Sequence, residues 1–181
     1  MNQLFHIIYV SNLSTIFITM LVLLIAWSIF GALFYRKMRP IGAMMAVIFS
    51  VIILCGTIFS RSGGVYGYEL MPFSSFRMVV EQPEIYRSML MNVFFFIPLG
   101  LALPFVFNGS TTKRILLTIA SGFALSVTVE VLQGTLSLGL AETDDVICNT
   151  LGAAIGSCGY LLSLLWIKLR NKRKKGETTR E

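Results

Sequence analysis

The chain of 181 residues has unusually few charged side chains. Asp, Glu, Lys and Arg make up 13% of it, whereas a soluble globular domain has about 25%. So few charges cannot cover the surface of a soluble domain of this length, which excludes a soluble nucleic-acid-binding domain. The high apolar content, 55% of residues, excludes a disordered chain. The deficit of charge indicates that most of the surface faces lipid.

Histidine and cysteine are also scarce. His6 is the only histidine, which excludes most histidine-based metal binding and acid–base chemistry, and we expect it at the membrane interface. Cys55, Cys148 and Cys158 form no Cys-x-x-Cys pair and lie in apolar stretches, so we interpret them as small core residues. The sequence contains neither a glycine-rich phosphate loop nor a His-Glu-x-x-His motif. We therefore expect no resident metal and no cofactor.

The chain contains several long apolar stretches. A membrane-spanning helix needs about 20 mostly apolar residues, and five stretches have this length: about 14–35, 41–60, 88–107, 115–136 and 145–169. Pro98 and Pro104 interrupt the third stretch, where neighbouring helices can satisfy the backbone groups that proline leaves unbonded. We predict an all-α, polytopic membrane helical bundle with five transmembrane helices, forming one domain over residues 1–181.

The positions of Lys and Arg predict the orientation of the bundle. With the N-terminus outside and the C-terminus inside, every basic residue except Arg61, Arg77 and Arg87 lies on the inner side. Residues 61–87 then form an outer loop, and residues 170–181 form a basic cytoplasmic tail beside anionic lipids. No basic segment precedes the first apolar stretch, so we expect no cleaved signal peptide. This placement of the basic residues favours membrane lipids, and not nucleic acid, as partners.

Polar and small residues lie along one face of each of the last two predicted spans. The repeated spacing of three and four residues produces this alignment on a helix. The fourth span carries Gly122, Ser126, Glu130, Gln133 and Ser137, and the fifth carries Asp145, Asn149, Gly152, Gly156, Gly159 and Ser163. Gly152, Gly156 and Gly159 predict close packing against a neighbouring helix. Glu130 needs a partner or a role, because a charge at the bilayer centre costs about 2.5–3.5 kcal/mol.

The directions of the spans bring six polar residues to one depth in the outer leaflet. They are Arg87, Asn92, Glu130, Gln133, Asp145 and Asn149. Each of the six also has a structural interpretation. The three amides can form interhelical hydrogen bonds, and Asp145, together with Asp144 beside it, places favourable negative charge at a helix N-terminus. Glu130 and Arg87 can form an ion pair with each other. Their convergence at one depth favours an outward-facing polar pocket.

Four segments resemble the signature of VanZ-like proteins, in the family's order over about residues 69–160. Asn92 to Gly100 is similar to the family's pattern of Asn, Phe, Pro and Gly alternating with hydrophobic residues. Glu130 to Gln133 resembles its Glu-x-x-Gln, and Asp145 to Gly152 its Asp-x-x-x-Asn-Thr-x-Gly. Leu70 to Phe73, which includes Pro72, resembles its Asn-Leu-x-Pro-Phe, although Glu69 replaces the usual Asn. Many members also carry an Arg before the acidic cluster, which residues 139–141 lack.

The resemblance implies a multi-pass protein of the bacterial plasma membrane. The founding member of the family is associated with low-level resistance to the lipoglycopeptide antibiotic teicoplanin, so the resemblance implies a class of phenotype and not a reaction. Under the first hypothesis the protein is a non-enzymatic envelope factor. Its pocket binds a lipid-linked cell-wall precursor or a lipoglycopeptide, with Arg87 holding an anionic group. Secondary candidates for this pocket are Pro72, Phe73, Ser126 and Asp144.

Two alternatives stay open from the sequence. One is an intramembrane enzyme that modifies an envelope lipid, with Glu130 and Asp145 as general acid and base, or with carboxylates that hold Mg²⁺ or Mn²⁺. The other is a proton-coupled carrier with Glu130 as the relay, although five spans do not divide into two equal inverted halves. The oligomeric state is open under each hypothesis.

Overall fold

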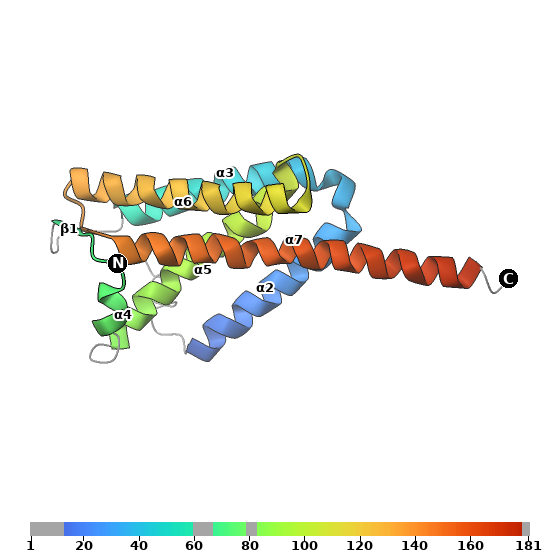
Figure 1. The fold of residues 1–181 in the computed structure, drawn as a ribbon, viewed down its shortest axis with the longest axis horizontal. Coiled ribbons are helices and arrows are strands. Elements are labelled where there is room, and N and C mark those ends of the chain that lie inside the picture. The colour runs from blue at the N-terminus through green and yellow to red at the C-terminus, as the bar shows by residue number, and fades with distance from the viewer. Residues whose placement is uncertain (1–12, 60–66, 79–82, 179–181) are drawn as a thin grey trace.

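The protein is an almost entirely helical bundle (Figure 1). The computed structural model describes residues 13–59, 67–78 and 83–178. Five of its helices are long and apolar enough to cross a membrane, which confirms the predicted all-α membrane bundle. Their bounds are α2 Leu13–Leu33, α3 Met38–Phe59, α5 Pro83–Val106, α6 Thr111–Thr135 and α7 Thr143–Thr178. His6 and Arg61 lie outside the described residues.

Helix α7 runs through the middle of the bundle. It packs against α2, α5 and α6, while α3 packs against α5. At Gly152 and Gly156 a Cβ atom would overlap the backbone carbonyl oxygens of Val93 and Ile97 on α5. Small residues therefore let α5 and α7 approach backbone to backbone, and this contact holds the polar residues of both helices close together.

The ends of α5 and α6 differ from the ends of the predicted spans. Helix α5 begins at Pro83, a residue suited to a first helical turn, so Arg87 lies within the helix and not at its start. Helix α6 begins at Thr111 because the Ser110 hydroxyl caps it, accepting the N–H of Lys113 at 3.3 Å. Helix α6 also ends at Thr135, so Ser137 lies in the following turn and outside the polar face of the helix.

The predicted basic tail continues helix α7 instead of forming a separate segment. Helix α7 extends to Thr178 and projects beyond the other helices (Figure 1). Lys and Arg have high helix propensity, so the apolar part of the helix can continue into this basic stretch. The described basic side chains Lys168, Arg170, Lys172, Arg173 and Lys175 are all exposed.

The side chains on the outside of the bundle are largely apolar. Ile18 is 63% exposed on α2 and Val47 is 64% exposed on α3, as expected where the surrounding solvent is lipid. Cys148 is buried, but Cys55 and Cys158 are exposed. The interpretation of all three cysteines as core residues was therefore wrong for two of them, because an apolar stretch in a membrane has a lipid-facing side as well as a core-facing side.

A small sheet and a short helix, which the sequence does not predict, close one end of the bundle. Strand β1 Gly67–Glu69 pairs in parallel with β2 Leu140–Glu142, in a register that places Tyr68 beside Ala141. Helix α4 Ser74–Met78 follows β1. We call this end, where α6 finishes and α5 and α7 begin, the strand end (Figure 1). At the other end, the short 3-10 helix η1 Tyr35–Lys37 joins α2 to α3.

Candidate functional site

Buried polar side chains link α5, α6 and α7 near the strand end. Asn92 on α5 donates from Nδ2 to Oδ1 of Asp145 on α7, at 2.6 Å. Asn149, one turn further along α7, donates from Nδ2 to the hydroxyl oxygen of Ser126 on α6, at 2.8 Å. Ser126, Asp145 and Asn149 are all buried. The two amides therefore connect α7 to α5 and to α6. We use the name polar cluster for Asn92, Ser126, Glu130, Gln133, Asp145 and Asn149.

Glu130 fixes the chain where it enters α7. Its side chain is buried on α6, and Oε2 accepts the backbone N–H of Glu142 at 2.9 Å. Glu142 is the last residue of β2 and immediately precedes α7. A charge-assisted hydrogen bond of this kind offsets part of the cost of burying a carboxylate. Glu130 thus ties α6 to the start of α7 across the intervening turn.

Asp144, which the sequence indicated only as a secondary candidate for the pocket, has a large structural role. The side chain is 1% exposed, and its two oxygens accept the backbone N–H groups of Phe73 and Ser75, at 2.6 and 2.7 Å. The first N–H groups of a helix have no partner within it, so Asp144 supplies partners for those at the start of α4. The Ser75 hydroxyl also donates to Oε2 of Glu142 at 3.0 Å. These bonds hold residues 67–78, which we call the clamped loop, against the start of α7.

The clamped loop presents apolar side chains on its exposed side. Leu70 is 72% exposed, and Met71, Phe73 and Phe76 are also exposed. Phe73 has a φ of 64°, a left-handed conformation that bulky residues rarely adopt. The hydrogen bond to Asp144 holds it in this conformation. The loop is thus fixed by buried carboxylates while its apolar side chains face outward.

Three details of the strand end concern the clamped loop and the segments where the chain departs from the family signature. Glu69 accepts the backbone N–H of Met71 through Oε1 at 3.1 Å, a local side-chain-to-backbone bond of the kind that Asn and Asp form in turns. Glu69 therefore supplies the loop bond for which the family's Asn is suited. The ring of Tyr68 covers Gly134 on α6 so closely that a Cβ atom there would overlap it. Residues 139–141, which lack the family's Arg, lead into and form part of β2.

The remaining predicted site residues lie on the same helices or in the clamped loop. Arg87 is half-buried on α5, before Asn92, and Gln133 is buried on α6, one turn beyond Glu130. Pro72 is exposed in the clamped loop. Within residues 13–59, 67–78 and 83–178, no three His, Cys, Asp or Glu side chains form a group that could hold a metal ion.

Sequence reasoning did not identify Ser75 or Glu142 as parts of this end. Both act through hydrogen bonds between segments far apart in the chain, Ser75 with Asp144 and Glu142 with Ser75. One signal was available: Glu142, Asp144 and Asp145 form an acidic run directly before a long apolar helix. One acidic side chain is enough to complement the positive end of a helix dipole, so three of them indicate a further role.

These features define a polytopic α-helical membrane protein with a polar cluster and a clamped loop at one end of the bundle. The family model described as VanZ/LLP1 matches residues 20–166, a range that includes the polar cluster and the clamped loop. The chain belongs to the VanZ/LLP1 family, which confirms the resemblance inferred from its motifs. No curated protein and no solved structure matches the chain.

Proposed function

We propose that this protein is a non-enzymatic factor of the bacterial cell envelope that contributes to low-level resistance to lipoglycopeptides such as teicoplanin, or to envelope homeostasis. In this proposal the protein lies in the plasma membrane with its strand end outward and its C-terminus inside. The strand end binds an amphiphilic envelope molecule, either a lipid-linked cell-wall precursor or the lipoglycopeptide itself. The observation that carries the proposal is the rigid apolar loop beside the polar cluster.

The chemistry of this end suits an amphiphile. Leu70, Met71 and Phe73 offer exposed apolar surface, and contiguous surface of this kind often marks an interaction site. Asn92, which is half-buried and bonded to Asp145 at the start of α7, offers hydrogen-bonding groups. A lipid-linked precursor and a lipoglycopeptide each combine an apolar chain with a polar head, so either matches the two kinds of surface. The bonds from Asp144 fix the loop before binding, which lowers the entropy lost on association.

The hydrogen bonds of the carboxylates favour binding over acid–base catalysis. Glu130 accepts a backbone N–H, Asp144 accepts two, and Asp145 accepts an amide hydrogen from Asn92. A general acid or base must reach the proton that it transfers, whereas these groups hold parts of the protein together. Lipid mass spectrometry of cells expressing wild type or Glu130→Gln tests the enzyme alternative. We expect identical envelope lipids, and a lipid species that depends on Glu130 would favour the enzyme.

The proposal is tested by antibiotic susceptibility. Expression in a teicoplanin-sensitive bacterium should raise the inhibitory concentration of teicoplanin relative to empty vector. Phe73→Asn should abolish the increase, because Asn tolerates the left-handed φ but removes the apolar ring. Ser137→Asn is the matched control, since Ser137 has a φ of 53° and lies in an exposed turn of the same end. Wild type that gives no increase, or a Phe73 variant as resistant as wild type at equal protein levels, would contradict the proposal.

A further inference from the structure

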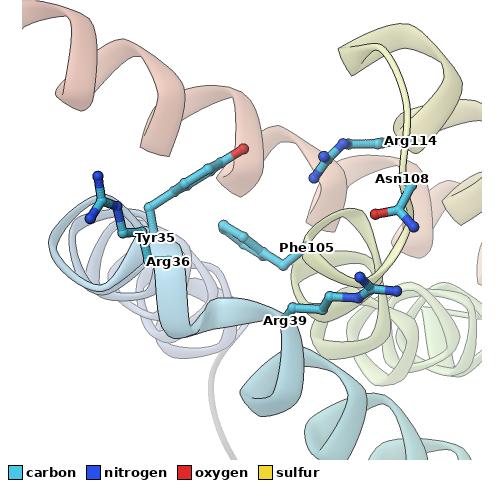
Figure 2. Close-up of a pocket in the computed structure, with 6 residues that line it drawn as sticks. All are labelled: Tyr35, Arg36, Arg39, Phe105, Asn108 and Arg114. Atoms are coloured by element: carbon cyan, nitrogen blue, oxygen red, sulfur yellow. The ribbon is translucent and has the colours of Figure 1, made fainter.

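A pocket lined by basic and aromatic side chains lies at the end of the bundle opposite the strand end. It has a volume of about 240 Å³ and lies between the turn that joins α2 to α3 and the turn that joins α5 to α6 (Figure 2). The lining residues are Tyr35, Arg36, Arg39, Phe105, Asn108 and Arg114. Three of these six are arginines and none is acidic, so the pocket concentrates positive charge.

The three arginines come from three different elements. Arg36 belongs to η1, Arg39 to the first turn of α3, and Arg114 to the first turn of α6. Among the described residues none of them forms an ion pair with a carboxylate. The acidic side chains that the structure describes are those of Glu69, Glu130, Glu142, Asp144 and Asp145, which all belong to the strand end or the polar cluster. The side chains of Glu84 and Glu177 lie outside the described part. Arginine side chains that line one pocket without a carboxylate partner favour the binding of an anion there.

Arg114 is held in place by the protein. Its Nε donates to the carbonyl oxygen of Gly109 at 3.1 Å, and Nη1 donates to that of Pro104 at 3.3 Å. Its guanidinium carbon lies 5.8 Å from the centre of the Tyr160 ring, which is within the range of a cation–π contact. These bonds use two of the five N–H donors of a guanidinium, so Arg114 presents the others from a fixed position.

Aromatic rings form the apolar side of the pocket. Phe105 is 4% exposed and packs edge-on against Tyr35 and Tyr160, with ring centres 6.1 and 5.1 Å away. The two tyrosine hydroxyls are 3.3 Å apart and share a hydrogen bond. Figure 2 shows Phe105 between Tyr35 on one side and Arg39 and Arg114 on the other, with Arg36 beyond Tyr35. The pocket therefore combines an apolar wall with one fixed cationic side chain, Arg114, and two exposed ones, Arg36 and Arg39.

We propose that this pocket binds the headgroup of an anionic phospholipid, whose phosphate carries a net negative charge because no cationic choline neutralises it. Arginine matches phosphate because its planar guanidinium donates two parallel hydrogen bonds. Tyr35, Val106 and Thr111 are ends of the apolar segments that can cross the membrane, so the pocket lies at the level where lipid headgroups meet water. Basic pockets between helices at this level bind anionic headgroups. The aromatic wall suits the glycerol and first acyl carbons of a lipid better than it suits a free phosphate ion.

Native mass spectrometry of the full chain tests the proposal. The protein is reconstituted in nanodiscs of phosphatidylcholine with or without phosphatidylglycerol, and the lipids retained after release are counted. Wild type should retain one phosphatidylglycerol, with a preference of at least about tenfold over phosphatidylcholine. Arg36→Gln combined with Arg39→Gln should remove most of this preference. Both side chains are exposed and have no partner among the described residues, so the fold should be retained.

The matched control is Lys37→Gln combined with Lys113→Gln. These exposed lysines lie in η1 and in the first turn of α6 and do not line the pocket, so this variant changes the net charge equally. The control should retain the preference for phosphatidylglycerol. An equal loss in both variants would overturn the proposal in favour of nonspecific attraction to a basic surface.

Two further outcomes would also overturn it. One is wild type that shows no preference for phosphatidylglycerol. The other is displacement of the lipid by millimolar inorganic phosphate, which would assign the pocket to free phosphate and not to a headgroup. Retention of phosphatidylglycerol at that phosphate concentration supports binding of the lipid headgroup.

Discussion

At the scale of single residues, Asp144 shows how one buried carboxylate organises the strand end. It accepts two backbone N–H groups from the clamped loop while lying in the first turn of α7. The sequence places Asp144 correctly at the start of a helix, where negative charge is favourable. The partners of the carboxylate could not be predicted, because Phe73 and Ser75 lie about 70 residues earlier in the chain and no periodicity connects the two segments.

Replacing Asp144 with Asn should therefore destabilise the protein. The amide group has only one accepting oxygen, so one buried N–H loses its partner, at a cost of about 2 kcal/mol in the free energy of unfolding. Denaturant unfolding in detergent, and protease cleavage within residues 67–78, should both report the loss. Glu69→Gln is the control, because Glu69 accepts only one exposed bond in the same loop. Equal stability of the two variants would show that Asp144 does not clamp the loop.

At the scale of elements, the packing of α5 on α7 depends on small residues. The three- and four-residue spacing predicts that Gly152, Gly156 and Gly159 share a face of the fifth span. That spacing does not say which helix the face meets, because the partner depends on how all five helices assemble. The strands were not predicted for a related reason: each has three residues, too few to show the alternation by which a strand is recognised.

Gly156→Ala should separate α5 from α7. A Cβ atom there would overlap the carbonyl oxygen of Ile97 and the backbone of Gly100, which cannot move without shifting a helix. We expect a loss of about 2–3 kcal/mol in the free energy of unfolding. Gly159→Ala is the matched control, since its Cβ would meet only the end of the Leu101 side chain, which can rotate away. The thermal midpoints of the two variants in one detergent give the comparison, and a larger drop for Gly159→Ala would contradict this packing.

At the scale of the whole molecule, acidic and basic side chains gather at opposite ends of the bundle. The carboxylates of Glu69, Glu130, Glu142, Asp144 and Asp145 lie at the strand end or in the polar cluster. The described basic side chains other than Arg77 and Arg87 lie at the other end or on the extension of α7. The number and approximate position of the spans could be predicted, because about 20 apolar residues suffice to identify each one. The pocket lined by Arg36, Arg39 and Arg114 could not be predicted, because it forms only where two turns that are distant in the sequence meet.

The proposed orientation predicts which end of the bundle is accessible to reagents added outside the cell. In a background in which Cys55, Cys148 and Cys158 are replaced, a cysteine introduced at Met71 should react in intact cells with a membrane-impermeant maleimide. A cysteine at Lys113 should react only after lysis. Both positions are exposed, so access and not burial decides the result. The reverse pattern would place the clamped loop in the cytoplasm and remove the proposed envelope function.

The most direct test of the central claim is binding of teicoplanin and of a lipid-linked cell-wall precursor to the purified protein in nanodiscs, measured by calorimetry. We predict saturable binding of at least one of them, weakened by at least about tenfold when Leu70 and Met71 are both replaced by Ser, because about 1.5–3 kcal/mol accompanies burial of each large apolar side chain. Leu136→Ser, which changes an exposed leucine at the end of α6, should bind like wild type. Absence of binding to either molecule, or equal binding by the loop variant, would contradict the account.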